Sequence, residues 1–170
     1  MSNLGMGGAN RAGSSVEWYT PPHIFDALGL EFDLDPCAPP GGVPWVPARR
    51  CYSLLDDGLA LPWFGRVWLN PPYGREAAKW VDRLGRHGNG VALVFARVDP
   101  AWGQRALAAA DSVCFIAGRL RFISGLDRNG PGHNAPVSSM LLGFGECADA
   151  VRNCGLGVSF FHNNKERQAA

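Results

Sequence analysis

The chain lacks the marks of several protein classes. No apolar run approaches the roughly 20 residues that a membrane-spanning helix requires. Residues 1–15 are rich in Gly, Ser and Asn and do not have the charged-then-apolar layout of a signal peptide. Charged residues make up only 18% of the 170 residues, and the net charge of +1 is far below that of a dedicated nucleic-acid coat. We therefore expect a soluble globular protein without a membrane partner, with polar tails at 1–15 and 163–170.

Cysteine is present, but not in a metal-binding or disulfide pattern. The five cysteines are Cys37, Cys51, Cys114, Cys147 and Cys154. None of them forms a C-x-x-C pair, and their number is odd. A zinc site or a disulfide framework is therefore disfavoured, and we expect reduced cytoplasmic thiols and no bound metal.

Apolar runs alternate with helical patterns through residues 16–162, which we expect to form one domain. Helices are predicted over 21–29, 76–86 and 100–110, and strands over 32–35, 67–69, 90–95, 113–116, 138–144 and 158–161. The Pro- and Gly-rich stretches 38–47 and 124–136 are predicted to be loops. Strands that alternate with helices predict βαβ units, and therefore an α/β fold with a mostly parallel central sheet and helices on both faces.

The most informative motif is Asn70-Pro71-Pro72-Tyr73, which follows the apolar run 67–69. Because proline has no N–H, two adjacent prolines cannot continue a strand ladder or a helix interior. The motif therefore predicts a rigid loop at the carboxyl end of a strand, where open α/β sheets bind ligands. The amide oxygen of Asn70, the carbonyl of Pro71 and the ring of Tyr73 are suited to hold and stack a planar amine. We interpret these four residues as the catalytic loop.

Three further segments hold candidate cofactor contacts. They are Asp35-Pro36-Cys37-Ala38 after a predicted strand, Thr20-Pro21 before the first helix, and Asp57-Gly58 in a turn. A carboxylate at Asp35 can meet an ammonium or ribose hydroxyls, and Asp57 can accept a hydrogen bond from an adenine amine. Thr20 is expected to cap the helix, whose free N–H groups can bind a carboxylate. Each segment also has an ordinary explanation as a turn or a cap, and the fingerprint G-x-G-x-x-G is missing.

Together, the order T-P-P, D-P-C-A, D-D-G-L, N-P-P-Y-G resembles the S-adenosylmethionine-dependent DNA N6-adenine methyltransferases. More narrowly, it is similar to the small Dam-type enzymes of phages and prophages. The segments 93–99, 118–122 and 134–136 continue the likeness, which covers residues 16–145. The short motifs are modestly specific one by one, whereas their order and spacing are much more so.

This resemblance implies a Rossmann-like methyltransferase fold, the cofactor S-adenosylmethionine, and double-stranded DNA as partner in the cytoplasm of a bacterial host. It implies that residues 70–73 surround the target adenine, and that Thr20, Pro21, Asp35, Pro36, Cys37 and Ala38 line the cofactor pocket. Asp57, with Gly58, would receive the adenine of the cofactor. The chain departs from larger methyltransferases because Pro36-Cys37-Ala38 stands where they have glycines.

An adenine inside a duplex must be turned out of the base stack before it can enter a pocket. Candidates for the phosphate contacts that offset this cost are Arg75, Lys79, Arg97, Arg105, Arg119, Arg121 and Arg128, of which Arg97 and Arg121 are the strongest. The 124–136 loop, with Arg128 and Asn134, has donors for base edges. Because a chain of this length leaves no room for a separate recognition domain, we expect a short recognition site.

Two other readings of the same residues stay open. Loops like residues 70–73 also occur in methyltransferases of protein glutamine, RNA guanine and, usually with Ser in place of Asn70, cytosine N4. All of these substrates present a planar amine. The second reading is a methyltransferase-like module that binds nucleic acid without catalysis.

Overall fold

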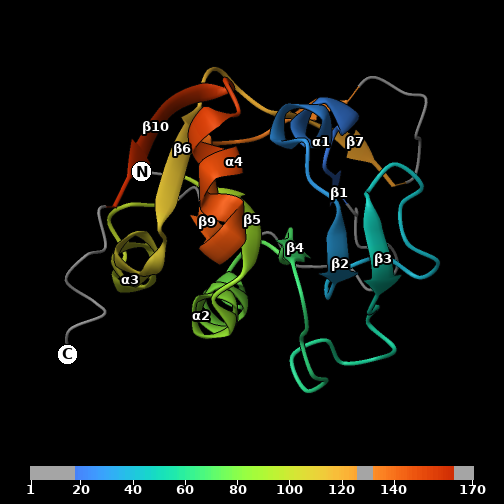
Figure 1. The fold of residues 1–170 in the computed structure, drawn as a ribbon. Helices are drawn as coiled ribbons and strands as arrows, with labels where there is room; N and C mark the ends of the chain where they lie inside the picture. Colours follow the sequence, from blue (N-terminus) through green and yellow to red (C-terminus); the bar gives the residue numbers. More distant parts are fainter. Residues whose placement is uncertain (1–17, 126–131, 163–170) are drawn as a thin grey trace, which may run out of the picture.

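A computed structural model describes residues 18–125 and 132–162 (Figure 1). Its helices are α1 (Pro22–Leu28), α2 (Ala77–His87), α3 (Ala101–Ala109) and α4 (Ala148–Asn153), with a 3-10 turn η1 (Gly145–Cys147). Its strands are β1 (Trp18–Tyr19), β2 (Phe32–Asp35), β3 (Ala48–Cys51), β4 (Val67–Leu69), β5 (Gly90–Phe95), β6 (Ser112–Ile116), β7 (Arg121–Ser124), β8 (His133–Asn134), β9 (Ser139–Phe144) and β10 (Gly157–Phe161). Every predicted helix and strand is present, with its ends within one residue of the prediction.

The main sheet has seven strands in the order β10-β6-β9-β5-β4-β2-β3. Pairing is parallel from β3 through β2 and β4 to β5, and antiparallel at β5–β9, β9–β6 and β6–β10. The fold is therefore α/β, but the sheet is mixed rather than mostly parallel. Since β9 runs against both β5 and β6, these two strands point the same way, and the carboxyl ends of β2, β4, β5 and β6 meet at one edge.

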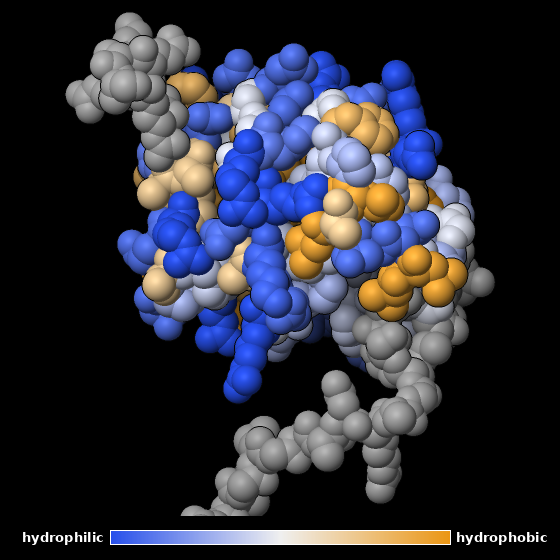
Figure 2. Space-filling view, turned by 90° about the horizontal axis from the view of Figure 1, so that it is seen from below, coloured by the Kyte–Doolittle hydropathy of each residue, from blue (hydrophilic) through white to orange (hydrophobic). Residues whose placement is uncertain are grey.

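Helices pack on both faces of this sheet, as expected. Side chains alternate along β5, so that Val91 and Leu93 join one buried cluster and Ala92 and Val94 join another. The first cluster includes side chains of α1 and α4, and the second includes side chains of α2 and α3. Figure 1 shows α4 in front of the sheet and α2 and α3 at its lower side. The outward face of α2, seen from below in Figure 2, is largely hydrophilic.

The elements that were not predicted are short or lie at an edge. Strands β1, β7 and β8 form a separate three-stranded sheet beside the main one, and β1 and β8 have only two residues each. β3 is an edge strand with mainly exposed side chains, so its sequence shows no apolar pattern. α4 has six residues, which is too few for a helical period to be recognised.

The start of α1 differs from the predicted one. The predicted Thr20 cap is wrong: Pro21 occupies the N-cap position, and α1 has no side-chain cap. The Thr20 side chain is instead buried, and its hydroxyl oxygen has no hydrogen-bond partner. The expected tails at 1–15 and 163–170 lie outside the described residues.

Candidate active site

The candidate site lies where strand order reverses. After β2 the chain adds β3 on one side of it, and then crosses to the other side to form β4. Asp35 ends β2 and Asn70 follows β4 directly, so both lie at the carboxyl edge of the sheet beside this crossover. Ligands of open α/β sheets bind at such a point.

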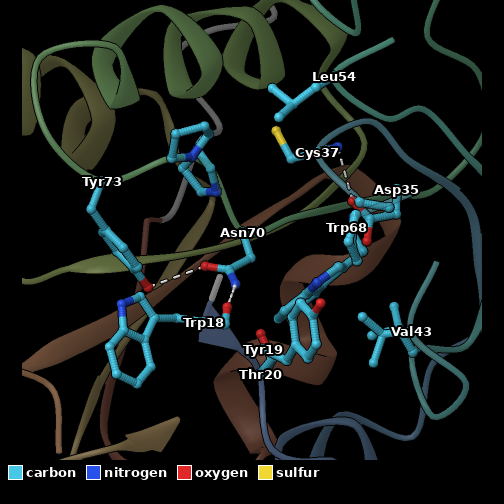
Figure 3. Close-up of a pocket in the computed structure, with 15 residues that line it drawn as sticks. Trp18, Tyr19, Thr20, Asp35, Cys37, Val43, Leu54, Trp68, Asn70 and Tyr73 are labelled. Atoms are coloured by element: carbon cyan, nitrogen blue, oxygen red, sulfur yellow. Dashed lines mark hydrogen bonds between the residues drawn. The ribbon is translucent and has the colours of Figure 1, made fainter. Parts of the chain in front are cut away.

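A cavity opens between these strand ends, which we call the carboxylate cavity after Asp35 (Figure 3). Eight of the predicted residues line it: Thr20, Asp35, Cys37, Ala38, Asn70, Pro71, Pro72 and Tyr73. Its volume is about 200 Å³, whereas typical small-molecule sites begin at roughly 300 Å³. A nucleoside-sized ligand would therefore extend past the mouth, where Leu54 lies 80% exposed.

Asn70 is held by two hydrogen bonds. Its Nδ2 donates to the backbone oxygen of Trp18 over 3.1 Å, and its Oδ1 accepts from the Tyr73 hydroxyl over 3.1 Å. The Trp18 carbonyl can only accept, so it fixes which end of the amide is the nitrogen. The Asn70 oxygen is thereby directed toward Tyr73, as Figure 3 shows.

The Tyr73 ring packs against two other aromatic side chains. It stacks on Phe95 with ring centroids 3.9 Å apart and planes 10° apart, and it meets Phe122 edge-on at 5.9 Å. This burial raises the pKa of the phenol well above its ordinary value. Tyr73 is therefore a neutral hydrogen-bond donor at any physiological pH.

Among the described residues, Asp35 is the only carboxylate that lines the carboxylate cavity, and no Lys, Arg or His lines it. It is 6% exposed, and its Oδ1 accepts a hydrogen bond of 3.0 Å from the backbone N–H of Cys37. Burial raises the pKa of Asp35 to about 7, although the Cys37 N–H lowers it in part. A buried carboxyl without a cation favours a positively charged ligand, which would stabilise its ionised form.

Four predicted cofactor residues lie outside this lining. Pro21 and Pro36 are buried beside it, whereas Asp57 is exposed in a turn with a φ of 49°. Gly58 packs so closely on Pro36 that a Cβ at this position would collide with the Pro36 carbonyl oxygen. Gly58 therefore packs against the loop that follows Asp35, and neither Asp57 nor Gly58 lines the cavity.

A second cavity of about 460 Å³ lies across Tyr73 from the first. We call it the aromatic cavity, and it is lined by Trp18, Tyr73, Phe95, Phe122, His133, Asn134, Ala135 and Pro136. Trp18 and Tyr73 line both cavities, and Asn70 is bonded to each of them. Asn70 therefore sits at the junction of a cavity with a carboxylate and a cavity with aromatic walls.

His133 belongs to the 124–136 loop that was predicted to contact bases, but its contact with Trp18 was not predicted. Their rings meet edge-on at 4.9 Å, because β1 and β8 both pair with β7. Trp18 lies two residues before Thr20 of the T-P-P segment, which was the one available signal in the sequence. Nothing in the sequence brings residues 18 and 133 together.

Comparison with known protein families bears on this arrangement. The family model described as DNA N-6-adenine-methyltransferase (Dam) matches residues 11–154. The chain belongs to this family. The match spans the Asn70–Tyr73 loop and both cavities, and it confirms the resemblance inferred from the motifs. No curated protein and no solved structure gave a match.

The residues predicted to contact DNA in this Dam-family chain lie in different surroundings. Arg75 and Arg97 line a third cavity next to Tyr73. Arg121 is exposed on β7, and its Nε donates to the Gly132 carbonyl, while Asn134 on the paired strand β8 lines the aromatic cavity. Lys79, Arg105 and Arg119 have protein partners in Glu76, Asp82 and the Ala135 carbonyl. Arg128 lies outside the described residues.

Two further expectations concern metals and membranes. Over residues 18–125 and 132–162, no group of three or more His, Cys, Asp or Glu side chains is arranged to hold a metal ion. Within the same ranges, no helix has the length and apolar character needed to cross a bilayer. All five cysteines are free thiols.

Proposed function

We propose that this Dam-family chain transfers a methyl group from S-adenosylmethionine to N6 of an adenine that is turned out of double-stranded DNA. The observation that carries the proposal is the position of Asn70 between the carboxylate cavity and the aromatic cavity. The proposed reaction has a cationic donor, S-adenosylmethionine, and a planar acceptor, adenine. Asn70 would position the acceptor amine between them, and each of the two cavities offers a place for one of these molecules.

The carboxylate cavity fits the donor. When bound, S-adenosylmethionine supplies an electrophilic methyl group on a sulfonium, and it carries an ammonium as well. Asp35 offers a buried carboxylate to these positive charges, and no Lys, Arg or His of residues 18–125 and 132–162 shares the lining with it. The unpartnered Thr20 hydroxyl, 2% exposed in the same lining, is a polar group that a ligand would satisfy.

The acceptor chemistry depends on Asn70. The lone pair of an exocyclic adenine amine is delocalised into the ring, which makes the amine a poor nucleophile. Hydrogen bonds from the NH2 group to the Asn70 Oδ1 and the Pro71 carbonyl would favour a tetrahedral nitrogen, whose lone pair then points at the methyl group. Asn70 does not act as a base, and the extra proton leaves to water after transfer.

The aromatic cavity fits the acceptor. Bases stack on aromatic side chains at roughly 1–3 kcal/mol each, and this cavity is walled by Trp18, Tyr73, Phe95 and Phe122. Turning the base out costs a few kcal/mol, so stacking of this size offsets a large part of that cost.

A Rossmann-like methyltransferase fold belongs to the same proposal. Strands β3, β2, β4, β5 and β6 point in one direction, and β9 is inserted against them. The coincidence of the crossover at β2–β4 with the carboxylate cavity supports this fold, because nucleotide-binding α/β sheets hold their ligands there.

Labelled methyl transfer to unmethylated DNA, followed by nucleoside mass spectrometry, tests the function. We expect N6-methyladenine as the product. Asn70→Ala should lose most of the turnover and keep its affinity for S-adenosylhomocysteine, since Asn70 acts on the target amine. Equal loss of both would assign Asn70 to the donor side. A product on cytosine, RNA or protein, or no product at all, would contradict the proposed substrate.

A further inference from the structure

The third cavity, which we call the arginine cavity, has no part in the methyl-transfer geometry above. Its volume is about 650 Å³, and it lies among the end of β5, the start of α2 and the loop before α3. Its lining includes Arg75, Arg97, Asp99 and Trp102. Its inner wall is the stacked pair of Tyr73 and Phe95, whose rings also form a wall of the aromatic cavity.

The charge of the arginine cavity is positive. Arg75 and Arg97 are both exposed, and no ion pair links either guanidinium to a carboxylate among residues 18–125 and 132–162. Asp99 is the one carboxylate in the lining, while nearby Glu76 is engaged by Lys79 at 2.8 Å. Two cations against one anion favour an anionic ligand.

The loop that carries Arg97 is held in place by α3. Gly103 in the first turn of α3 lies against the Arg97 carbonyl oxygen so closely that no Cβ would fit between them. The Gln104 side chain donates to the Val98 carbonyl, and the Gln104 N–H donates to the Pro100 carbonyl over 3.1 Å. The backbone of this loop is therefore set before any ligand arrives, which reduces the entropy lost on binding.

We propose that the arginine cavity binds the sugar and phosphate of the nucleotide next to the target adenine. A base held in the aromatic cavity brings its neighbouring phosphate past the Tyr73–Phe95 wall that separates the two cavities. Arg75 and Arg97 share this phosphate, and the indole of half-buried Trp102 packs against the deoxyribose. The inference rests on the proposed DNA substrate and adds the contact that holds the duplex while one base is turned out.

A phosphate contact has a signature that methyl transfer does not share. Each neutralised phosphate of duplex DNA contributes about 0.9 to the slope of log affinity against log salt. We would measure this slope by fluorescence anisotropy, with a labelled duplex of about 20 base pairs and mixed sequence, in the presence of S-adenosylhomocysteine. This length spans about two helical turns of about 10 base pairs each.

Arg75→Ala combined with Arg97→Ala should reduce the slope by about one, since the two guanidiniums share one phosphate. Trp102→Ala should weaken binding several-fold at every salt concentration without changing the slope, and Trp102→Phe should restore most of the affinity. Arg86→Ala is the control for loss of a surface guanidinium, because it removes one arginine from an exposed position of α2 outside the arginine cavity.

The outcomes separate this inference from the proposed function. If the wild-type chain methylates adenine but the double variant changes the slope no more than Arg86→Ala does, the phosphate site is wrong and the function stands. If the wild-type chain binds the duplex with the expected slope changes but methylates no adenine, the proposed function fails and the phosphate site stands. A chain that does not bind the duplex overturns both.

Discussion

At the scale of single residues, Tyr73 and the target amine compete for one acceptor. The Tyr73 hydroxyl donates to the Asn70 Oδ1, which is the atom that the amine of the target base requires. The Tyr73 ring also stacks on Phe95, so a planar group already fills part of the aromatic wall. We therefore expect an entering base to displace the Tyr73 hydroxyl from the Asn70 Oδ1.

Tyr73→Phe should tighten the interaction with DNA. Removing the hydroxyl frees Asn70 and keeps the ring, and a hydrogen bond of about 1 kcal/mol corresponds to roughly a fivefold lower KM for DNA. Tyr73→Ala should instead lower kcat/KM by about 10- to 100-fold, because it removes the stacking surface. Steady-state methyl transfer distinguishes the two variants. A Phe variant as impaired as the Ala variant would show that the hydroxyl itself acts on the target.

Asp35 makes the affinity for the cofactor depend on pH. Its pKa of about 7 is that of the protein without ligand, and only the ionised carboxylate attracts an ammonium. Affinity for S-adenosylhomocysteine, measured by calorimetry, should therefore fall as pH drops through 7. From pH 7.5 to pH 6 we expect a loss of about eightfold, following the ionised fraction. Asp35→Asn should bind more weakly at pH 7.5 and show little pH dependence. A wild-type affinity that does not change over this range would remove Asp35 from the ammonium site.

At the scale of elements, the site is made by loops that follow strands. Asp35 ends β2 and Asn70 begins the loop after β4, and Gly58 supports the loop after Asp35 from behind. Trp63 adds to this support by donating from Nε1 to the Gly58 carbonyl over 2.7 Å. The Asp57 turn thus acts through the position of Pro36 and Cys37.

Gly58→Ala should disturb this support. Its Cβ would meet the Pro36 carbonyl oxygen, and overpacking of this kind costs about 1–3 kcal/mol of unfolding free energy. Affinity for S-adenosylhomocysteine should fall as well, because Cys37 and Ala38 line the carboxylate cavity.

Gly85→Ala is the matched control, since its Cβ would meet only Ala109 at 3.6 Å and Phe144 at 3.9 Å. It lies within α2 and should add about 0.5–1 kcal/mol of stability through helix propensity. Urea denaturation of both variants measures the two effects. A Gly58→Ala chain as stable as the wild type, with normal ligand affinity, would show that the turn does not support the site.

Most of the main sheet could be predicted from the sequence, whereas the small three-stranded sheet could not. The strand before Asn70 was predictable because its three apolar residues are followed by Asn70 and two prolines. The helix after it was predictable because its apolar residues recur with a helical period. Strands β1, β7 and β8 were not, since pairs as short as Trp18–Tyr19 form only when β7 lies beside them. The place of Asp35 at the edge of the sheet was predictable from its position at a strand end, whereas the lack of a Lys, Arg or His beside it among the described lining residues was not.

At the scale of the whole molecule, the carboxylate cavity joins segments far apart in the sequence. Thr20 precedes α1, Asp35 ends β2, Leu54 follows β3 and Asn70 follows β4, yet all four line one space. The pairing of β2 with β3 and β4 brings three of these segments together, and the hydrogen bond from Asn70 to the Trp18 carbonyl joins the segment before α1 to them. A ligand bound there contacts the native arrangement alone, since the unfolded chain cannot assemble these residues.

Ligand binding should therefore stabilise the whole fold. A ligand present at 100 times its dissociation constant adds about 2.7 kcal/mol to the unfolding free energy, and in a domain of this size each kcal/mol raises Tm by about 2–4 °C. S-adenosylhomocysteine should thus raise Tm by roughly 5–10 °C in a thermal scan. Asn70→Ala should keep this shift because it acts on the acceptor side, whereas Asp35→Asn should reduce it at the same ligand concentration. Adenosine, which has no ammonium for Asp35, should give a smaller shift than S-adenosylhomocysteine. Equal shifts with both ligands would place the amino-acid end of the cofactor outside the carboxylate cavity.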